Sequence, residues 1–218
     1  MGWSYSKIKI MEFYIFGASG LAREIATYVL DLNYTINAFV DKSVGEKTVK
    51  VRGVHYNVIS EDEFDKQVED CNNFFNICIA IGFPKLRGTI WKKYENKCNI
   101  PNIIHPSVIM QDNIELGNGN IFAPNCVLTT DIKIGNANFF NLATTVGHDV
   151  NIGSFNVFNP RVAVSGNVLI KEFNLFGANS SIIQKVSIGS ENVIGMGSVV
   201  LRKVQNNLSL LGVPAKKI

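Results

Sequence analysis

The sequence of 218 residues is short of charge and of long apolar runs, and each shortage excludes a class of protein. Charged residues make up 18% of the chain and hydrophobic residues 46%, which excludes an intrinsically disordered protein. The net charge of +3 is too small and too scattered to indicate a nucleic-acid-binding surface. No apolar run approaches the roughly 18 residues of a membrane-spanning helix. We therefore expect a folded, cytoplasmic protein with neither a membrane nor a nucleic acid as its partner.

Cysteine and histidine are also scarce. The four cysteines, at positions 71, 78, 98 and 126, form no C-x-x-C pair, which favours reduced, packed thiols. There are only three histidines, and each one is a candidate catalytic or metal-binding residue. The first residues, Met1–Ser6, fit the loose M-G-x-x-x-[ST] myristoylation pattern, but that pattern is short and common.

The second half of the chain contains a repeat with a period of six. Every sixth residue from Ile104 to Val200 is apolar, seventeen positions without a gap, and chance would give this in roughly two trials per million. Glycine often follows the apolar residue, and the residue two places before the next one is small, β-branched or Asn. A period of six fits a short strand plus a corner, so three repeats form one triangular coil. Coils of this kind stack about 4.8 Å apart and bury their core against their neighbours.

Fourteen Asn residues lie between Asn113 and Asn192, and we expect them at corners because Asn tolerates left-handed backbone geometry. A β-sandwich would show a period of two and does not explain the six-residue period of apolar positions. This half of the chain resembles the hexapeptide-repeat acyltransferases, which form left-handed parallel β-helices and act as trimers. The resemblance implies the same fold and a homotrimer.

The first hundred residues predict a small parallel α/β domain. A strand at 12–16 ends in Gly17-Ala18-Ser19-Gly20, a helix follows at 21–32, and a second strand at 36–40 ends at Asp41. A glycine loop at a helix start lets backbone N–H groups approach a phosphate or a ribose, although this loop is not the full G-x-G-x-x-G. The pattern further predicts a strand at 74–81 ending at Gly82, a helix at 84–94 and a short strand at 102–104. We expect a Rossmann-like domain at 1–103 and a left-handed β-helix at 104–218.

The two halves together resemble the PglD-type nucleotide-sugar N-acetyltransferases, with the NeuD-type sialic acid O-acetyltransferases as relatives. The resemblance rests on these segments: Gly17–Gly20, Phe39–Asp41, Ala80–Gly82 with Arg87, Gly147–Asp149, Ser165–Val168 and Gly212–Lys217. It implies that acetyl-CoA is the co-substrate and that a UDP-linked amino sugar is acetylated on its 4-amino group. The alternative is O-acetylation of sialic acid or another sugar, as in the NeuD type, since the same base could activate a hydroxyl. It also implies that the front domain binds the nucleotide, through Gly17, Ala18, Ser19, Gly20, Asp41, Lys42 and Gly82.

His148 is the candidate general base. It follows the core position Val146 by two residues and should lie on the outside of the triangular prism that the stacked coils form. Histidine is the residue type that most often removes a proton from an attacking group in enzymes, here the amine of the acceptor. The resemblance implies that Asp149 is its carboxylate partner, where the family more often has Glu. Gly166 lies one coil further on and is expected to offer its N–H to the thioester oxygen.

The resemblance implies further acetyl-CoA contacts and shows two departures. Ala178 and Met196 match positions that line the pantetheine groove. Nine residues after the base, the family usually has a second His, and here it is Val157; either Asn156 substitutes for it or the contact is lost. The frequent Asp-Asp pair is Asp41-Lys42 here, and Lys42 would reach a diphosphate instead.

Two other functions are consistent with the same prism. A γ-type carbonic anhydrase needs three converging His ligands, whereas only His105 and His148 lie in the repeat, so we expect no metal. We expect structural roles for His105 and His55. His55 is expected to lie in a loop. A non-catalytic nucleotide-sugar binder would leave His148 and Asp149 without a role.

Overall fold

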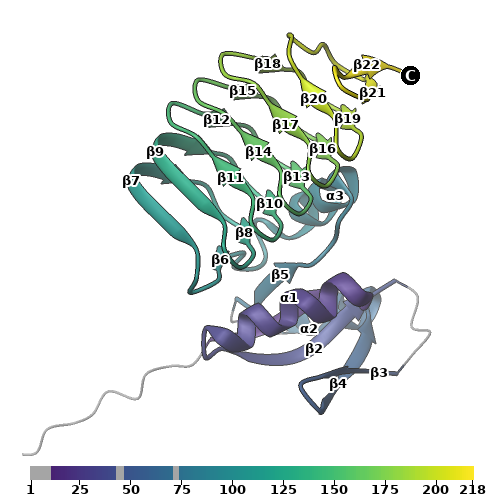
Figure 1. Ribbon diagram of the computed structural model, residues 1–218. Helices are drawn as coiled ribbons and strands as arrows, with labels where there is room; N and C mark the ends of the chain where they lie inside the picture. The colour runs from purple at the N-terminus through teal and green to yellow at the C-terminus, as the bar shows by residue number, and fades with distance from the viewer. Residues whose placement is uncertain (1–10, 43–46, 71–73) are drawn as a thin grey trace, which may run out of the picture.

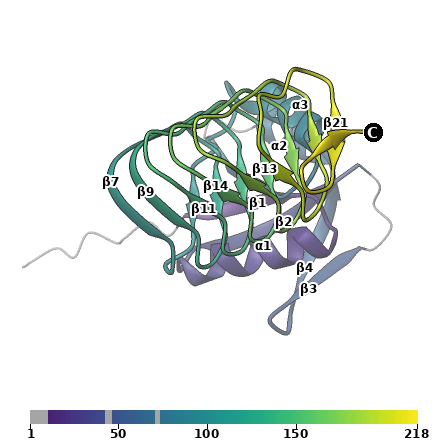
Figure 2. The same cartoon turned by 45° about the horizontal axis from the view of Figure 1, so that its top comes forward.

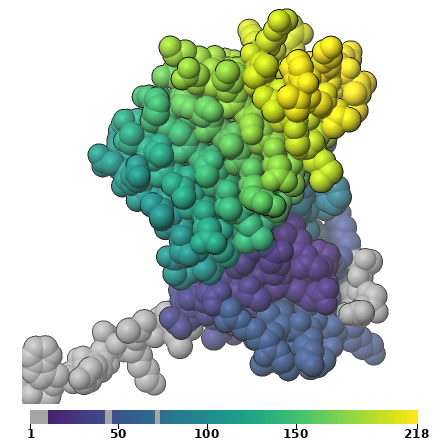
Figure 3. Space-filling model, viewed as in Figure 1, coloured from purple at the N-terminus to yellow at the C-terminus, as the bar shows by residue number. Residues whose placement is uncertain are grey.

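The computed structural model describes residues 11–42, 47–70 and 74–218. The myristoylation pattern at 1–6 and Cys71 lie outside these ranges. No helix within them is long and apolar enough to cross a membrane. Figure 1 shows an α/β domain below a triangular prism of stacked coils, and Figure 3 shows the two packed against each other.

The α/β domain contains a five-stranded sheet with the strand order β3-β4-β2-β1-β5. The central pairs are parallel, and β3 runs antiparallel to β4. The elements are β1 (Glu12–Phe16), α1 (Gly20–Asp31), β2 (Thr35–Asp41), β3 (Thr48–Val51), β4 (Val54–Ser60), α2 (Glu61–Asp70), β5 (Asn76–Ile79) and α3 (Pro84–Tyr94).

The β-helix begins at β6 and consists almost entirely of two-residue strands. Parallel pairing joins most strands to the one a full coil later, and the last strand, β22, pairs antiparallel with β21. Its strands are β6 (Ile103–Ile104), β7 (Ile109–Leu116), β8 (Ile121–Phe122), β9 (Val127–Ile134), β10 (Phe139–Phe140), β11 (Thr145–Val146), β12 (Asn151–Ile152), β13 (Val157–Phe158), β14 (Ala163–Val164), β15 (Leu169–Ile170), β16 (Leu175–Phe176), β17 (Ser181–Ile182), β18 (Ser187–Ile188), β19 (Val193–Ile194), β20 (Val199–Val200), β21 (Ser209–Leu211) and β22 (Lys216–Lys217).

We name the faces of the prism by their strands. The first face contains β6, β8, β10, β13, β16, β19 and β21. The second contains β11, β14, β17 and β20, and the third contains β12, β15 and β18. The long strands β7 and β9 run across the corner between the second and third faces. The predicted fold class, a small α/β domain followed by a β-helix of hexapeptide repeats, is confirmed.

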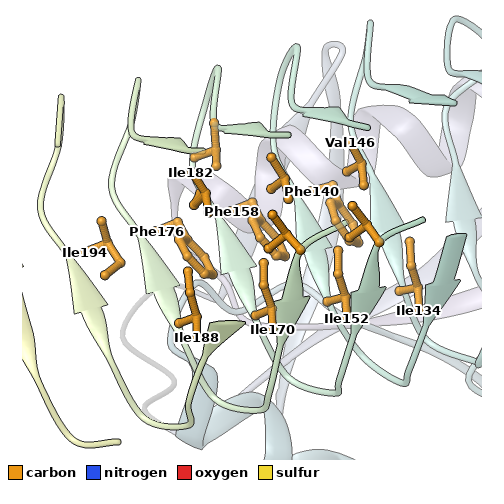
Figure 4. Close-up of a cluster of buried hydrophobic side chains, with 14 of the residues drawn as sticks. Ile134, Phe140, Val146, Ile152, Phe158, Ile170, Phe176, Ile182, Ile188 and Ile194 are labelled. Carbon is orange, nitrogen blue, oxygen red and sulfur yellow. The ribbon is translucent and has the colours of Figure 1, made fainter. Parts of the chain in front are cut away.

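The residues of the six-residue period fill the prism in columns (Figure 4). Phe122, Phe140, Phe158 and Phe176 stack face to face with centroids 4.6–4.7 Å apart. This distance is the strand spacing itself, so the coil repeat sets the ring stack. The first three positions of the series, Ile104, Met110 and Leu116, are partly buried against the same core.

The Asn residues serve two roles, of which only one was expected. The left-handed residue recurs every six positions, and it is Asn at 113, 125, 167 and 179, but Phe155, Phe173 and Lys185 also adopt that geometry. Five other Asn side chains form a ladder inside the corner between the third and first faces: Asn120, Asn138, Asn156, Asn174 and Asn192. From Asn138 onward, each donates its side-chain amide to the Oδ1 of the Asn a coil before, whereas Asn120 donates to the Gly135 carbonyl. The ladder satisfies polar groups that are fully buried.

The α/β domain packs on the first face of the prism. The outward residues Ile103, Ile121, Phe139 and Val157 are each only 1% exposed, because α1 covers them. Figure 1 shows α1 between the sheet and the prism, and Figure 2 shows the stacked coils in front of the α/β domain. Helix α3 lies along the Asn-ladder corner, where Trp91 meets Phe155. Domain and prism therefore share one continuous apolar interface.

Most predicted elements of the front domain are found within one or two residues of their expected ends. The strand expected at 74–81 is shorter, at Asn76–Ile79. The hairpin β3–β4 and the helix α2 were not predicted. The placement of His55 in a loop was wrong, since it lies within β4 and pairs with Lys50 of β3.

Candidate active site

His148 lies in the turn that joins the second face to the third. Val146 ends β11 and points into the core, and the next two residues leave the strand. The His148 side chain is 59% exposed. Gly147 allows the turn to pack closely on the next coil, because a Cβ there would lie 2.8 Å from the Gly166 nitrogen. The coil repeat thus holds the imidazole outside the prism, at a fixed position along the prism axis.

Asp149 contacts His148 directly. Its Oδ2 lies 2.7 Å from the Nδ1 of His148. Asp149 has a φ of 57°, a left-handed conformation that Asp tolerates better than most residues, and this turns its carboxylate back toward the ring. A carboxylate only accepts hydrogen bonds, so in the neutral ring the proton sits on Nδ1 and the lone pair of Nε2 points outward. This tautomer is the one that a general base requires.

Gly166 forms the floor beneath the imidazole. A Cβ on Gly166 would lie 2.6 Å from Nε2 and 2.7 Å from Cε1 of His148. The N–H of Asn167 donates to the His148 carbonyl over 2.8 Å and ties the two coils together. Within the described part of the chain, the Gly166 N–H donates no hydrogen bond. A lone pair and a free backbone donor therefore lie side by side at this corner.

Two of the residues expected to contact acetyl-CoA lie at a different corner. Ala178 and Met196 lie one coil apart where the first face turns into the second, and the N–H of Gly197 donates to the Ala178 carbonyl over 2.8 Å. Met196 is 70% exposed. The second face separates these residues from His148 within one chain.

The expectation that Asn156 contacts acetyl-CoA is contradicted by its position. Asn156 is fully buried in the Asn ladder. Its amide donates to Asn138 and to the Lys171 carbonyl, and its oxygen accepts from Asn174. Val157 is buried beneath α1. Neither residue faces a groove, so neither takes over the role of the family's second His.

The glycine loop and the end of β2 surround a cavity of about 130 Å³. Gly17, Asp41 and Lys42 line it. Gly17 has a φ of 108°, and a Cβ would lie 3.0 Å from the Ala80 carbonyl, so only glycine fits where the loop leaves β1. The Asp41 carboxylate accepts the N–H of Ala18 over 3.0 Å and fixes the loop.

The other predicted nucleotide-binding residues adjoin this cavity without lining it. Ser19 is the N-cap of α1, and Gly20 is its first residue. Gly82 follows Ile81, which lines the cavity, and packs against Leu21. The helix N-terminus and the loop therefore meet at the carboxyl ends of β1 and β2, where open parallel sheets bind ligands.

Sequence reasoning missed several residues of the cavity. Glu61, Leu86 and Ile90 line it from α2 and α3. Lys93 lies 2.7 Å from both Glu61 and Asp65 and so compensates the Glu61 charge. Leu86 and Ile90 lie four residues apart on one helix face. This spacing was the feature of the sequence that could have identified them as part of the cavity wall.

An ion-pair cluster stabilises the wall behind Glu61. Tyr94 donates its hydroxyl hydrogen to Asp65 over 2.7 Å. Burial alone would raise the pKa of Asp65, but hydrogen bonds from Lys93 and Tyr94 hold it below its ordinary value. The cluster joins α2 to α3 on the flank of the nucleotide cavity.

A larger hollow, of about 800 Å³, lies elsewhere. It runs along the outside of the third face, from Glu115 to Ser190, and includes none of the predicted site residues. It is an open trough over a flat sheet. The two predicted sites, each with convergent polar groups, are the better candidates for chemistry.

The three histidines lie on separate elements. His55 is in β4, His148 is at its corner, and His105 contacts Ser107 and Asp31 at the domain junction. Among the described residues, no group of three or more His, Cys, Asp or Glu side chains is arranged to hold a metal ion.

Comparison with known proteins agrees with the fold. Residues 12–94 match the PglD N-terminal domain. The whole chain is similar to a mutant of the perosamine N-acetyltransferase from Caulobacter crescentus, solved in complex with CoA and GDP-perosamine. Identity is 26%, coverage is 96% of this chain and 97% of that one, and the TM-score is 0.85.

Two further structures are similar over the same length. WeeI from Acinetobacter baumannii AYE is 25% identical, with 95% of this chain and 100% of that one covered and a TM-score of 0.85. The acetyltransferase domain of PglB from Neisseria gonorrhoeae FA1090, at 23% identity, 95% and 99% coverage and a TM-score of 0.84, shares the fold. No curated protein sequence matches the chain significantly.

The β-helix, the front domain and these likenesses define the class: the chain is an acyltransferase built on hexapeptide repeats. Within that class it is a sugar N-acetyltransferase, and its residues 12–94 match the PglD N-terminal domain. The resemblance inferred from the sequence is confirmed.

Proposed function

We propose that the protein transfers an acetyl group from acetyl-CoA to the 4-amino group of a nucleotide-linked amino sugar, with a UDP-sugar as the first candidate. The observation that carries this proposal is the outward Nε2 of His148, oriented by Asp149 and lying beside the free N–H of Gly166. The perosamine enzyme of Caulobacter crescentus was solved with GDP-perosamine, so GDP-sugars are the second candidates.

The reaction uses groups that the site already presents. The Nε2 of His148 removes a proton from the substrate amine as its nitrogen attacks the acetyl carbon. The N–H of Gly166 donates to the thioester oxygen as negative charge develops on it. The C–S bond then breaks, and the proton on His148 passes to the leaving thiolate of CoA. The Asp149 carboxylate stabilises the imidazolium formed on the way.

The amino sugar enters through its nucleotide. The cavity at Gly17 offers backbone N–H groups at the start of α1 and the cation of Lys42 beside it. Both features favour a diphosphate. The nucleotide-binding residues proposed are Gly17, Ala18, Ser19, Gly20, Asp41, Lys42 and Gly82.

A second copy of the chain completes the site. The α/β domain covers the first face, whereas His148 stands at the corner between the other two faces, opposite the first. A sugar held by Gly17 of one copy therefore reaches His148 of another copy. Acetyl-CoA would lie in the crevice between the His148 corner of one prism and Ala178 and Met196 of the next. We propose a homotrimer with three such crevices.

The buried thiols of Cys78, Cys98 and Cys126 support a cytoplasmic location, because free cysteines persist in reducing compartments. Acetyl-CoA and nucleotide sugars meet there. A role in glycan synthesis follows from the proposed product.

The test is a panel of UDP-, dTDP- and GDP-linked 4-amino sugars with acetyl-CoA, followed by thiol release and mass spectrometry of the product. We expect a gain of one acetyl group that resists mild alkali, as an amide does. An alkali-labile product would indicate O-acetylation and contradict the proposal. H148A is expected to lose about 10²–10⁴-fold in turnover. H55A removes another exposed histidine and serves as the matched control.

The assembly has its own measurement. Light scattering at micromolar concentration should give the mass of three 24.1 kDa chains. A monomer that is fully active would contradict the shared site.

A further inference from the structure

Arg87 is the largest of the fully buried side chains, and its exposure is 0%. It projects from α3 into the interface between the α/β domain and the prism. Within the described part of the chain, no carboxylate lies within salt-bridge distance of its guanidinium. A buried cation without a counter-ion costs several kcal/mol unless hydrogen bonds replace its water. Its retention in the interior calls for a specific role.

Backbone carbonyls from both domains replace that water. On the α/β side, Nη1 donates to Ile79 over 2.7 Å and to Ile81 over 2.9 Å. On the prism side, Nε donates to Ala137 over 2.8 Å, and Nη2 approaches the Asn138 carbonyl at 3.4 Å. The planar fork of a guanidinium can reach four such oxygens at once, which an ammonium cannot.

Both anchor points matter for the proposed site. Ile81 lines the nucleotide cavity, and a Cβ on Gly17 would lie 3.0 Å from both the Ala80 carbonyl oxygen and the Cδ1 of Ile81. On the prism, Asn138 belongs to the Asn ladder, and Ala137 is a left-handed corner residue with a φ of 51°. The guanidinium therefore links the wall of the nucleotide cavity to a rigid corner of the β-helix.

Burial lowers the pKa of Arg87 to about 10, so the side chain stays charged at neutral pH. Its guanidinium also lies 6.0 Å from the centroid of the Phe139 ring, on the first face. The guanidinium is thus charged and is held by groups of both domains.

We propose that Arg87 is a positioning residue for the sugar substrate: it fixes the nucleotide cavity relative to the prism, so that the amine reaches the acetyl group in attacking geometry. The inference rests on the proposed function, because it concerns the same acceptor site. It does not extend to acetyl-CoA, whose groove lies on the corners away from α3. Misplacing one substrate by about 1 Å can reduce turnover by about 10²-fold.

The experiment compares R87K, R87M and K85M in the full-length protein. Lys85 also joins α3 to the prism, through a 2.6 Å ion pair with Glu191, but its side chain is 77% exposed. It is therefore a matched control for a cross-domain contact, and exposed pairs contribute little. We measure kcat and KM for the nucleotide sugar, the Kd of CoA by calorimetry, and the unfolding midpoint.

We expect R87M to lower kcat/KM for the nucleotide sugar by about 10²-fold, R87K to recover part of that loss, and K85M to match the wild type. The Kd of CoA should change less than about twofold in all three. Hydrogen exchange should show faster opening at 79–82 and 136–139 in R87M.

Three results would overturn the inference: unchanged kinetic constants in R87M, an equal loss in CoA binding, or failure of both Arg87 variants to fold. The last result would assign Arg87 to folding and not to positioning. A wild-type protein inactive on every nucleotide sugar would instead refute the proposed function, and this inference with it.

Discussion

The replacement of Gly166 by Ala tests the arrangement at the His148 corner most sharply. The added Cβ would lie 2.6 Å from Nε2 and 2.7 Å from Cε1 of His148. Ordinary contacts between such atoms begin near ~3.5 Å, so the ring must retreat by roughly 1 Å. The side chain is 59% exposed and has room to swing outward. The strain is therefore relieved by moving the imidazole and not by unfolding the coil.

The expected cost follows from that displacement. Moving a base by about 1 Å from its attacking geometry reduces turnover by about 10²-fold, which corresponds to about 2.7 kcal/mol in the activation free energy. The Gly166 N–H is preserved in G166A, so loss of a donor to the thioester oxygen does not contribute. The unfolding free energy should change by less than about 1 kcal/mol.

The assay is steady-state thiol release with a double-mutant cycle. If Gly166 acts by seating His148, then G166A has no further effect once His148 is already Ala. We expect kcat of H148A and of the double variant to agree within about twofold. Wild-type turnover in G166A, or losses that simply add in the double variant, would refute the reasoning.

Three further predictions concern other residues. D149N keeps the side-chain size and the tolerance for left-handed geometry but removes the charge beside Nδ1 of His148. It should lower kcat by about tenfold or more, and unchanged turnover would show that Asp149 has no role in catalysis. N156A leaves ladder partners unsatisfied and should cost about 2–4 kcal/mol in urea unfolding, while the folded fraction binds CoA as the wild type does; a selective loss of CoA affinity would restore Asn156 to the cofactor site. The pKa of Asp65 is lowered in the fold, so its ion pairs stabilise the protein above the ordinary carboxyl pKa of 3.8 and lose that effect as pH falls further. The difference in unfolding free energy between the wild type and D65N should therefore be full at pH 7 and shrink toward zero below pH 3.8; a difference that does not depend on pH would contradict the ion-pair account.

The sequence alone determined the β-helix. Each six-residue repeat specifies its own strand, corner and inward-pointing residue, and neighbouring repeats have the same pattern. The local period therefore predicts the fold of the whole domain. The same holds for β1, α1 and β2, where strand, glycine loop and helix follow one another directly. His148 was predictable as an exposed residue because its place in the period fixes which way it points.

The role of Asn could not be read from composition. Asn113 and Asn156 are the same residue type in the same repeat, yet one turns a corner and the other fills one. The difference lies in the place within the hexad and in the partner a coil away, which hydrogen bonding across the stack decides. The hairpin β3–β4 and helix α2 were missed because their apolar content is low and their packing partners lie on distant elements.

Only the tertiary structure decided how the two halves meet. Whether α1 would cover the first face or another face depends on apolar surfaces that come from segments more than eighty residues apart, such as Ile25 and Phe139. That choice leaves His148 on the far corner and buries Arg87 among four carbonyls of both domains. Period and motif act through neighbours along the chain, whereas the placement of the site is set by side-chain packing between segments that the chain itself keeps apart.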